Sequence, residues 1–109
     1  MKLNFAEMAE VAMEHFRGGD GTVYAKMFND GSNRIMQCRF PKGASIGKHC
    51  HDTSSETFYV LSGECTVILA DGEEVLRAGD CHHCPKGTTH TVINSGDGDM
   101  VLFAVVPEQ

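Results

Sequence analysis

Three histidines and one glutamate are spaced so that together they could bind a divalent metal ion. His49, His51 and Glu56 lie close together in the chain, and His90 follows far downstream. Imidazole nitrogens combined with a carboxylate suit Mn, Fe, Ni, Co or Zn better than Ca or Mg. Four protein ligands leave open positions on an octahedral ion, where water or a substrate could bind.

The spacing of the first three residues is compatible with one shared pocket. Alternate residues of a β-strand point to the same face, so His49 and His51 project together and Cys50 points away. The four residues between His51 and Glu56 are enough to turn the chain and return a carboxylate from the next strand. Taken alone, the His-x-His pair is more typical of two surface histidines on a solvated strand.

The elements that must position these residues are short strands. From Thr22 onward, runs of alternating apolar residues are separated by Gly-containing turns, which predicts an all-β barrel or jelly roll over about residues 22–106. The predicted strands span residues 23–28, 34–40, 47–51, 57–61, 65–69, 74–77, 80–84, 90–94 and 100–105. Within them, Phe58 and Val60 are expected to face inward and Tyr59 outward.

Residues 4–16 have the pattern of a short amphipathic helix. Asn4 and Glu7 form a capping-box pattern, and apolar residues recur at helical spacing up to Phe16. The polar face is acidic, which disfavours binding to a membrane surface. We expect this helix to pack against the barrel or a neighbouring subunit.

Length and composition indicate one globular domain spanning residues 1–109. The net charge is −6 with neutral histidines, which disfavours nucleic acid and anionic membrane surfaces as partners. No apolar run has the length of a membrane-spanning helix, and charged residues near the N-terminus are unlike a secretion signal. We therefore expect a soluble cytoplasmic protein. Its five cysteines are an odd number and cytoplasmic thiols stay reduced, so a disulfide framework is not expected.

Two blocks of the sequence resemble the two motifs of the cupin superfamily. In the first, five residues separate Gly43 from His49, one leads to His51, four to Glu56 and six to Gly63. In the second, five residues separate Gly79 from Pro85, one leads to Gly87, two to His90 and three to Asn94. Every defining position of both motifs is filled, and the short interval between them is similar to that of small single-domain bacterial cupins.

The resemblance implies a fold, a metal site and a range of functions. It implies a cupin-type jelly-roll β-barrel, also called a double-stranded β-helix. One divalent transition metal would be bound by His49, His51, Glu56 and His90, and two chains would pair as a homodimer. It implies a metal-dependent enzyme on a small organic acid or related metabolite, of the dioxygenase, decarboxylase, lyase or isomerase class. The alternatives are a non-catalytic module that binds a small molecule and a storage or structural cupin.

The segment Cys81-His82-His83-Cys84 differs from the apolar residues usual at this place in cupins. Its Cys-x-x-Cys spacing suggests zinc or redox chemistry, but on a strand the two cysteines face opposite sides. If residues 80–84 and 89–94 form a hairpin, His83 lies opposite His90. This register places His83 and Cys81 on the metal side, with His83 beside the ligands or facing the substrate, and His82 outside. A slip of one residue reverses the assignment.

The arginines argue against one substrate class. Arg34, Arg39 and Arg77 are isolated in the sequence and form no evident phosphate clamp. A sugar phosphate is therefore not the favoured substrate.

Overall fold

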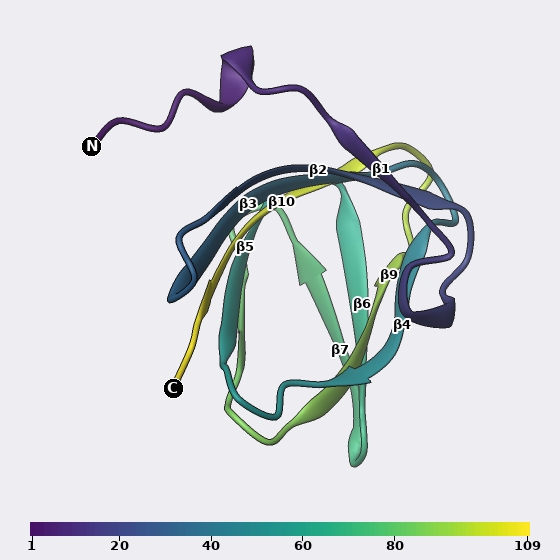
Figure 1. Cartoon of the computed structure of the whole chain (residues 1–109). Helices are drawn as coiled ribbons and strands as arrows, with labels where there is room; N and C mark the ends of the chain where they lie inside the picture. Colours follow the sequence, from purple (N-terminus) through teal and green to yellow (C-terminus); the bar gives the residue numbers. More distant parts are fainter.

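Two antiparallel sheets face each other and enclose the interior of a jelly roll in the computed structural model, which describes residues 1–109 (Figure 1). The larger sheet has the strand order β1-β2-β3-β10-β5-β8, and the smaller has the order β4-β9-β6-β7. The larger sheet contains β1 (Val11–Glu14), β2 (Thr22–Asn29), β3 (Asn33–Phe40), β5 (Glu56–Ser62), β8 (Cys81–Cys84) and β10 (Met100–Pro107). The smaller contains β4 (Ser45–Cys50), β6 (Glu64–Leu69), β7 (Gly72–Arg77) and β9 (Thr89–Asn94). The predicted all-β fold is confirmed.

The core lies between the two sheets and follows from strand alternation. In β10, every second residue from Met100 to Val106 is buried, and β9 shows the same alternation. Sixteen buried hydrophobic residues form one cluster. Phe58 and Val60 belong to it, whereas Tyr59 between them is 44% exposed. The predicted directions of these three side chains are confirmed.

The motif positions that carry no imidazole or carboxylate shape the turns. Gly63 has a φ of +84°, and a Cβ there would lie 2.7 Å from the carbonyl oxygen of Asp99, so only glycine fits this position. The Asn94 side chain is buried and donates hydrogen bonds to the carbonyl oxygens of Phe40 and Gly98, each at 2.8 Å. These residues therefore maintain the loops at one end of the barrel.

The N-terminal segment differs from its prediction. The chain has a short N-terminal helix, but it is a single 3-10 turn, Phe5–Glu7, and its predicted extent of 4–16 is wrong. Val11–Glu14 instead forms β1, the edge strand of the larger sheet, which pairs antiparallel with β2. Hydrogen bonds to β2 outweigh the helical spacing of the apolar residues, because local propensity is weak against tertiary pairing.

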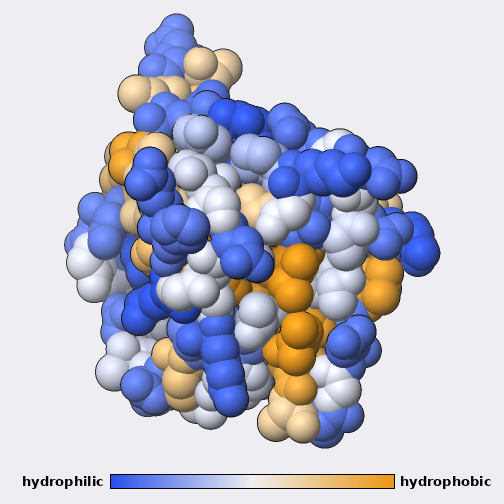
Figure 2. Space-filling model, turned by 90° about the vertical axis from the view of Figure 1, so that its right-hand side faces the viewer, coloured by the Kyte–Doolittle hydropathy of each residue, from blue (hydrophilic) through white to orange (hydrophobic).

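One face of the outer surface is mostly polar (Figure 2). Figure 2 shows hydrophilic side chains over most of one face, interrupted by a narrow apolar band, with one segment projecting from the top. None of the helices has the length and apolar character needed to cross a bilayer.

Candidate metal centre

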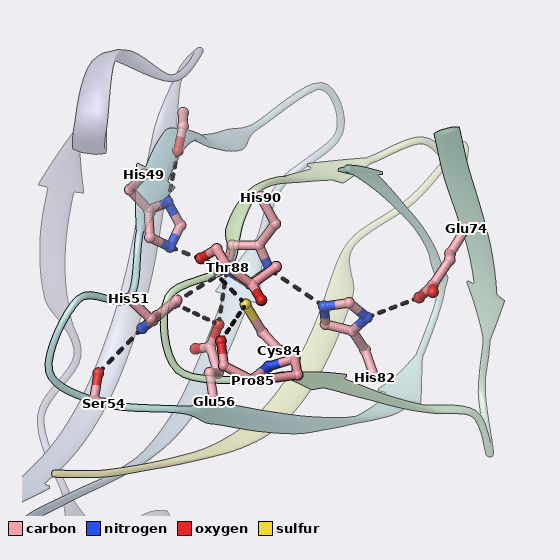
Figure 3. A network of polar contacts seen from close by, with 11 residues as sticks. His49, His51, Ser54, Glu56, Glu74, His82, Cys84, Pro85, Thr88 and His90 are labelled. Carbon is pink, nitrogen blue, oxygen red and sulfur yellow. Dashed lines mark hydrogen bonds and ion pairs between the residues drawn. The ribbon is translucent and has the colours of Figure 1, made fainter. Parts of the chain in front are cut away.

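The four predicted ligand residues meet inside the barrel, where they come from three strands and one loop. His49 is on β4, Glu56 begins β5, His90 is on β9, and His51 lies in the loop directly after β4. Their donor atoms all lie within 4.8 Å of one another (Figure 3). Cys50 is exposed, which confirms that it points away from the cluster.

The loop at His51 is tied to the turn that precedes β9. The His51 amide donates to the carbonyl oxygen of Thr88 at 3.1 Å, and the Gly87 amide donates to the carbonyl oxygen of His51 at 2.6 Å. His49 and His90 are cross-strand partners in the β4–β9 pair. Backbone bonds thus join the two sequence blocks and fix the distance between their histidines.

Hydrogen bonds at Nδ1 orient two of the imidazoles. His49 Nδ1 lies 2.7 Å from the carbonyl oxygen of Gly47, which can only accept, so Nδ1 carries the proton. In the neutral ring this leaves a lone pair on Nε2. His51 Nδ1 lies 3.3 Å from Ser54 Oγ. Each ring therefore presents Nε2 to the centre of the cluster.

The contacts among the inward-facing atoms are too many for hydrogen bonds alone. His90 Nε2 lies 3.1 Å from His49 Nε2, 3.2 Å from His51 Nε2 and 3.1 Å from Glu56 Oε1. One ring nitrogen carries at most one proton, so it cannot make all three hydrogen bonds. Two ligand atoms that are each about 2.1 Å from one ion, with a right angle between their bonds to it, lie about 3.0 Å apart. The donor set therefore fits a metal ion at its centre.

Electrostatics favour a charged carboxylate beside an uncharged imidazole. Burial by itself would raise the pKa of Glu56, but hydrogen bonds from His51 and His90, together with their charges, lower it to about 2. Burial lowers the pKa of His49 below its usual value, although its bond to the Gly47 carbonyl opposes this effect. A carboxylate and a neutral imidazole are the forms that bind metals.

The cluster borders a largely apolar cavity with a volume of about 60 Å³. Twelve of the 17 residues that line the cavity are hydrophobic, and His49, His51 and Glu56 also line it. His90 is not part of the lining and is fully buried behind the others. An ion held by the four residues would therefore be reached from the cavity past His49, His51 and Glu56.

Two arginines, Arg17 and Arg34, also line this cavity. The sequence did not indicate that these two residues lie in one site. The 3-10 turn η2 (Phe16–Gly18) contains Arg17 and packs directly on β4, because Gly19 and Gly47 allow the two backbones to approach. A Cβ on Gly47 would lie 2.1 Å from the carbonyl oxygen of Arg17. Sequence spacing could not reveal this pair, since a 3-10 turn and a distant strand supply it.

The prediction for His83 is wrong. Strand β8 pairs with β5 and not with β9, so His83 lies opposite Thr57 and its Nδ1 is 2.9 Å from the exposed Thr57 Oγ1. In β8 the buried residues are His82 and Cys84, and the exposed ones are Cys81 and His83. The two cysteines do face opposite sides, as expected, but the inner and outer faces are exchanged. His82 is the polar residue near the cluster that the sequence analysis placed outside.

A jelly roll with three inward histidines and one glutamate defines a β-barrel with a candidate metal centre. The family model described as "Cupin domain" matches residues 36–106, and the chain belongs to this family.

Two curated relatives differ in how much of their length the chain covers. An oxalate-binding protein of Thermotoga maritima is 27% identical over 113 residues, which cover 97% of this chain and 93% of the relative. Quercetin 2,3-dioxygenase of Bacillus subtilis is 39% identical over 86 residues, which cover 78% of this chain but only 25% of the dioxygenase. The chain thus corresponds to nearly all of the first protein and a quarter of the second.

Solved structures agree on the fold. A predicted oxalate decarboxylase from Thermotoga maritima superposes with a TM-score of 0.93 at 25% identity, with both chains covered completely. A sugar phosphate isomerase from Silicibacter pomeroyi has a TM-score of 0.82 at 18% identity, over all of this chain and 76% of the isomerase. At that identity the second likeness concerns the fold alone.

Proposed function

We propose that the protein is a metal-dependent enzyme that acts on a small organic acid. In this proposal His49, His51, Glu56 and His90 bind one divalent transition metal, which is Mn, Fe, Ni, Co or Zn. The supporting observation is the convergence of four donor atoms within 4.8 Å, three of whose residues line the same cavity. A bound metal supplies Lewis-acid or redox chemistry at such a place.

The cavity favours an acid with an apolar body. Phe40, Phe58 and Leu102 are among the hydrophobic residues of its wall, and Arg17 and Arg34 are its cationic ones. A guanidinium pairs well with a carboxylate, and apolar walls bind hydrocarbon and exclude water. Oxalate, with two carboxylates and no hydrocarbon, would leave most of this wall without a partner. We therefore favour a longer aliphatic or aromatic acid.

A non-catalytic binding module is the second candidate. It is supported by the relative whose length the chain covers almost completely, because that protein is named for binding oxalate. The same residues would then hold a metal and an acid without converting it.

Metal binding is tested first, by removing all metal and reloading the protein with each of the five ions in turn. Elemental analysis should give one ion per chain in the wild type and none in His49→Ala. His15→Ala is a matched control, because His15 lies outside the cluster and should leave the metal content unchanged. A wild type that takes up none of the five ions would contradict the proposal.

The substrate class is tested with the metal-loaded protein. Oxalate, aliphatic acids and aromatic acids are compared by binding calorimetry and by mass spectrometry of products, with and without dioxygen. Arg34→Met should weaken acid binding about tenfold, while Arg77→Met, whose side chain is 70% exposed, should not. Turnover supports the enzyme, and binding without turnover supports the second candidate. Tighter binding of oxalate than of longer acids would contradict the preference for an apolar body.

We also propose a homodimer with reduced thiols, as expected for a cytoplasmic protein. All five cysteines are free, which is consistent with a reducing compartment. Light scattering of the purified protein should give twice the mass of one chain, and a single-chain mass would contradict the dimer.

A further inference from the structure

His82 connects the proposed ligand His90 to a carboxylate on another strand. Its Nε2 lies 3.2 Å from His90 Nδ1, and its Nδ1 lies 2.8 Å from Glu74 Oε1 (Figure 3). The His82 ring is 2% exposed and packs between His90 and Phe58, with ring centroids 5.4 Å and 5.0 Å away. The side chains of Glu74, His82 and His90 thus form a continuous hydrogen-bonded line from the barrel surface to the cluster.

The two strands that carry Glu74 and His82 are edge strands of different sheets. β7 ends the smaller sheet and β8 ends the larger one, and no backbone pairing joins them. The Glu74–His82 contact therefore bridges the two sheets where the ladders stop. The side chain of Glu74 is 51% exposed, so the line begins at the solvent.

The proton positions along this line follow from what each atom can do. A carboxylate only accepts hydrogen bonds, so His82 Nδ1 carries a proton that it donates to Glu74. In neutral His82 the other nitrogen, Nε2, then accepts, and His90 Nδ1 must donate to it. A neutral His90 protonated at Nδ1 has its lone pair on Nε2, the atom that faces His49, His51 and Glu56.

We propose that Glu74 and His82 are positioning residues that hold His90 in the tautomer and orientation needed to bind a metal through Nε2. This inference rests on the proposed metal site. Partners at the second nitrogen of a metal-binding imidazole orient the ring and increase its basicity, and their loss typically weakens metal binding about 10- to 100-fold. His82 and Glu74 thus extend the site beyond the four ligands.

The competing arrangement is a second ion bound by His82, Cys84 and His90, whose ligand atoms also lie within 4.8 Å of one another. That ion would need a thiolate at Cys84 and a lone pair on His90 Nδ1. Burial raises the pKa of the Cys84 thiol to about 11, and its sulfur contacts the carbonyl oxygen of Thr88 at 3.7 Å. A protonated thiol that donates to a carbonyl is a poor ligand, so we favour the hydrogen-bonded line.

The test uses the full chain and pairs each variant with a control of the same residue type. Glu74→Ala is compared with Glu73→Ala, its exposed neighbour, and His82→Leu with His83→Leu on the outer face. His82→Gln retains an acceptor for the His90 proton and serves as the conservative rescue. Metal affinity is measured by competition with a chelator, and the melting temperature without metal monitors folding.

Glu74→Ala should weaken metal affinity up to about tenfold, and His82→Leu about 10- to 100-fold. His82→Gln should fall between His82→Leu and the wild type, and both controls should match the wild type. Equal affinities in the Glu74 and Glu73 variants, both folded, would overturn the inference. So would two ions per chain with a thiolate–metal absorption band that is lost in Cys84→Ser.

A second readout does not require metal. Long-range ¹⁵N–¹H NMR of the metal-free protein identifies which nitrogen of each histidine carries a proton. His90 should be protonated at Nδ1 in the wild type and should lose this preference in His82→Leu. A His90 ring with a proton on Nε2 and none on Nδ1 would overturn the inference. If the wild type bound no metal, the proposed site would be wrong, and this spectrum alone would still decide the tautomer.

Discussion

The two faces of β8 carry the same residue types in opposite environments. His82 and Cys84 are buried inside the barrel, whereas Cys81 and His83 are exposed on its outer face. Inside, His82 is hydrogen-bonded to His90 and Glu74; outside, His83 is hydrogen-bonded to the exposed hydroxyl of Thr57. A histidine thus gains a possible role at the metal centre from strand direction and strand partner, not from its type or its neighbours in sequence.

The same contrast holds at the other strands of the cluster. On β4, His49 faces the cavity and the adjacent Cys50 is exposed. On β5, Phe58 is buried against the core and Tyr59 is exposed. The polar groups that could bind a metal therefore lie on the inner face of the barrel, where apolar residues surround them. Paired substitutions of an inner and an outer residue test this contrast.

The largest expected difference is in metal affinity, between a variant at His90 and a variant at His83. His90→Ala removes a proposed ligand and leaves His82 Nε2 without its partner, so metal affinity should fall at least about 1,000-fold, or about 4 kcal/mol. His83→Ala should stay within about twofold of the wild type, because its ring is outside the barrel. Chelator competition measures both. Similar losses in the two variants would mean that the inner and outer faces are wrongly assigned.

Substitutions of Phe58 and of Tyr59 should differ in their effect on folding stability. Phe58 is 1% exposed in the core, and its replacement by alanine should lower the unfolding free energy by about 3–4 kcal/mol. Tyr59→Ala, at a side chain that is 44% exposed, should cost less than about 1 kcal/mol. Urea unfolding of the metal-free proteins provides the comparison. The contrast between faces fails if the Tyr59 variant is the less stable one.

Acid should reveal the charge at Glu56 in the metal-free protein. The pKa of its carboxyl is about 2 in the folded chain against an ordinary value of 4.5. Between these values the unfolded chain binds more protons, so this contribution is present above pH 4.5 and is lost as the pH falls toward 2. Glu56→Gln should be about 3 kcal/mol less stable at pH 7, with the difference shrinking in acid.

Glu73→Gln is the control for this titration, because Glu73 is on the exposed part of β7. Its unfolding free energy should match the wild type within about 0.5 kcal/mol across the same range. Urea midpoints at each pH give both curves. A Glu56→Gln difference that stays constant from pH 7 to pH 2 would show that the charge contributes nothing.

Thiol reactivity is the smallest expected difference. Burial raises the pKa of the thiols of Cys38 and Cys65 to about 12 and that of Cys84 to about 11. Because the thiolate is the reactive form, these three should react only after unfolding. Cys50 and Cys81 are exposed and should react in the folded protein. Absorbance with a disulfide reagent counts them, and fast labelling of Cys84 would contradict its inward direction.

Local patterns were sufficient to predict most of the barrel. Each strand predicted from Val23 onward overlaps an observed one, because period-two alternation and Gly-containing turns report directly on which residues face the core. The convergence of His49 with His90 also followed from the motif spacing, and the structure brings their nitrogens within 3.1 Å.

The failures came from long-range pairing. Sequence proximity favoured a β8–β9 hairpin, but β8 joins β5 in the other sheet, which reverses the faces assigned to His82 and His83. The predicted extent of the N-terminal helix was wrong for a related reason, because Val11–Glu14 pairs with β2. The contribution of Arg17 to the cavity depends on contact between Gly19 and Gly47, which no local pattern reports.

The most direct test of the metal centre is anomalous diffraction from crystals grown with Mn²⁺ and, separately, with Zn²⁺. We expect one strong peak per chain, within bonding distance of Nε2 of His49, His51 and His90 and of Glu56 Oε1. The coordination positions that these residues leave open should face the cavity. A peak among His82, Cys84 and His90 instead, or no peak inside the barrel with either metal, would contradict this account.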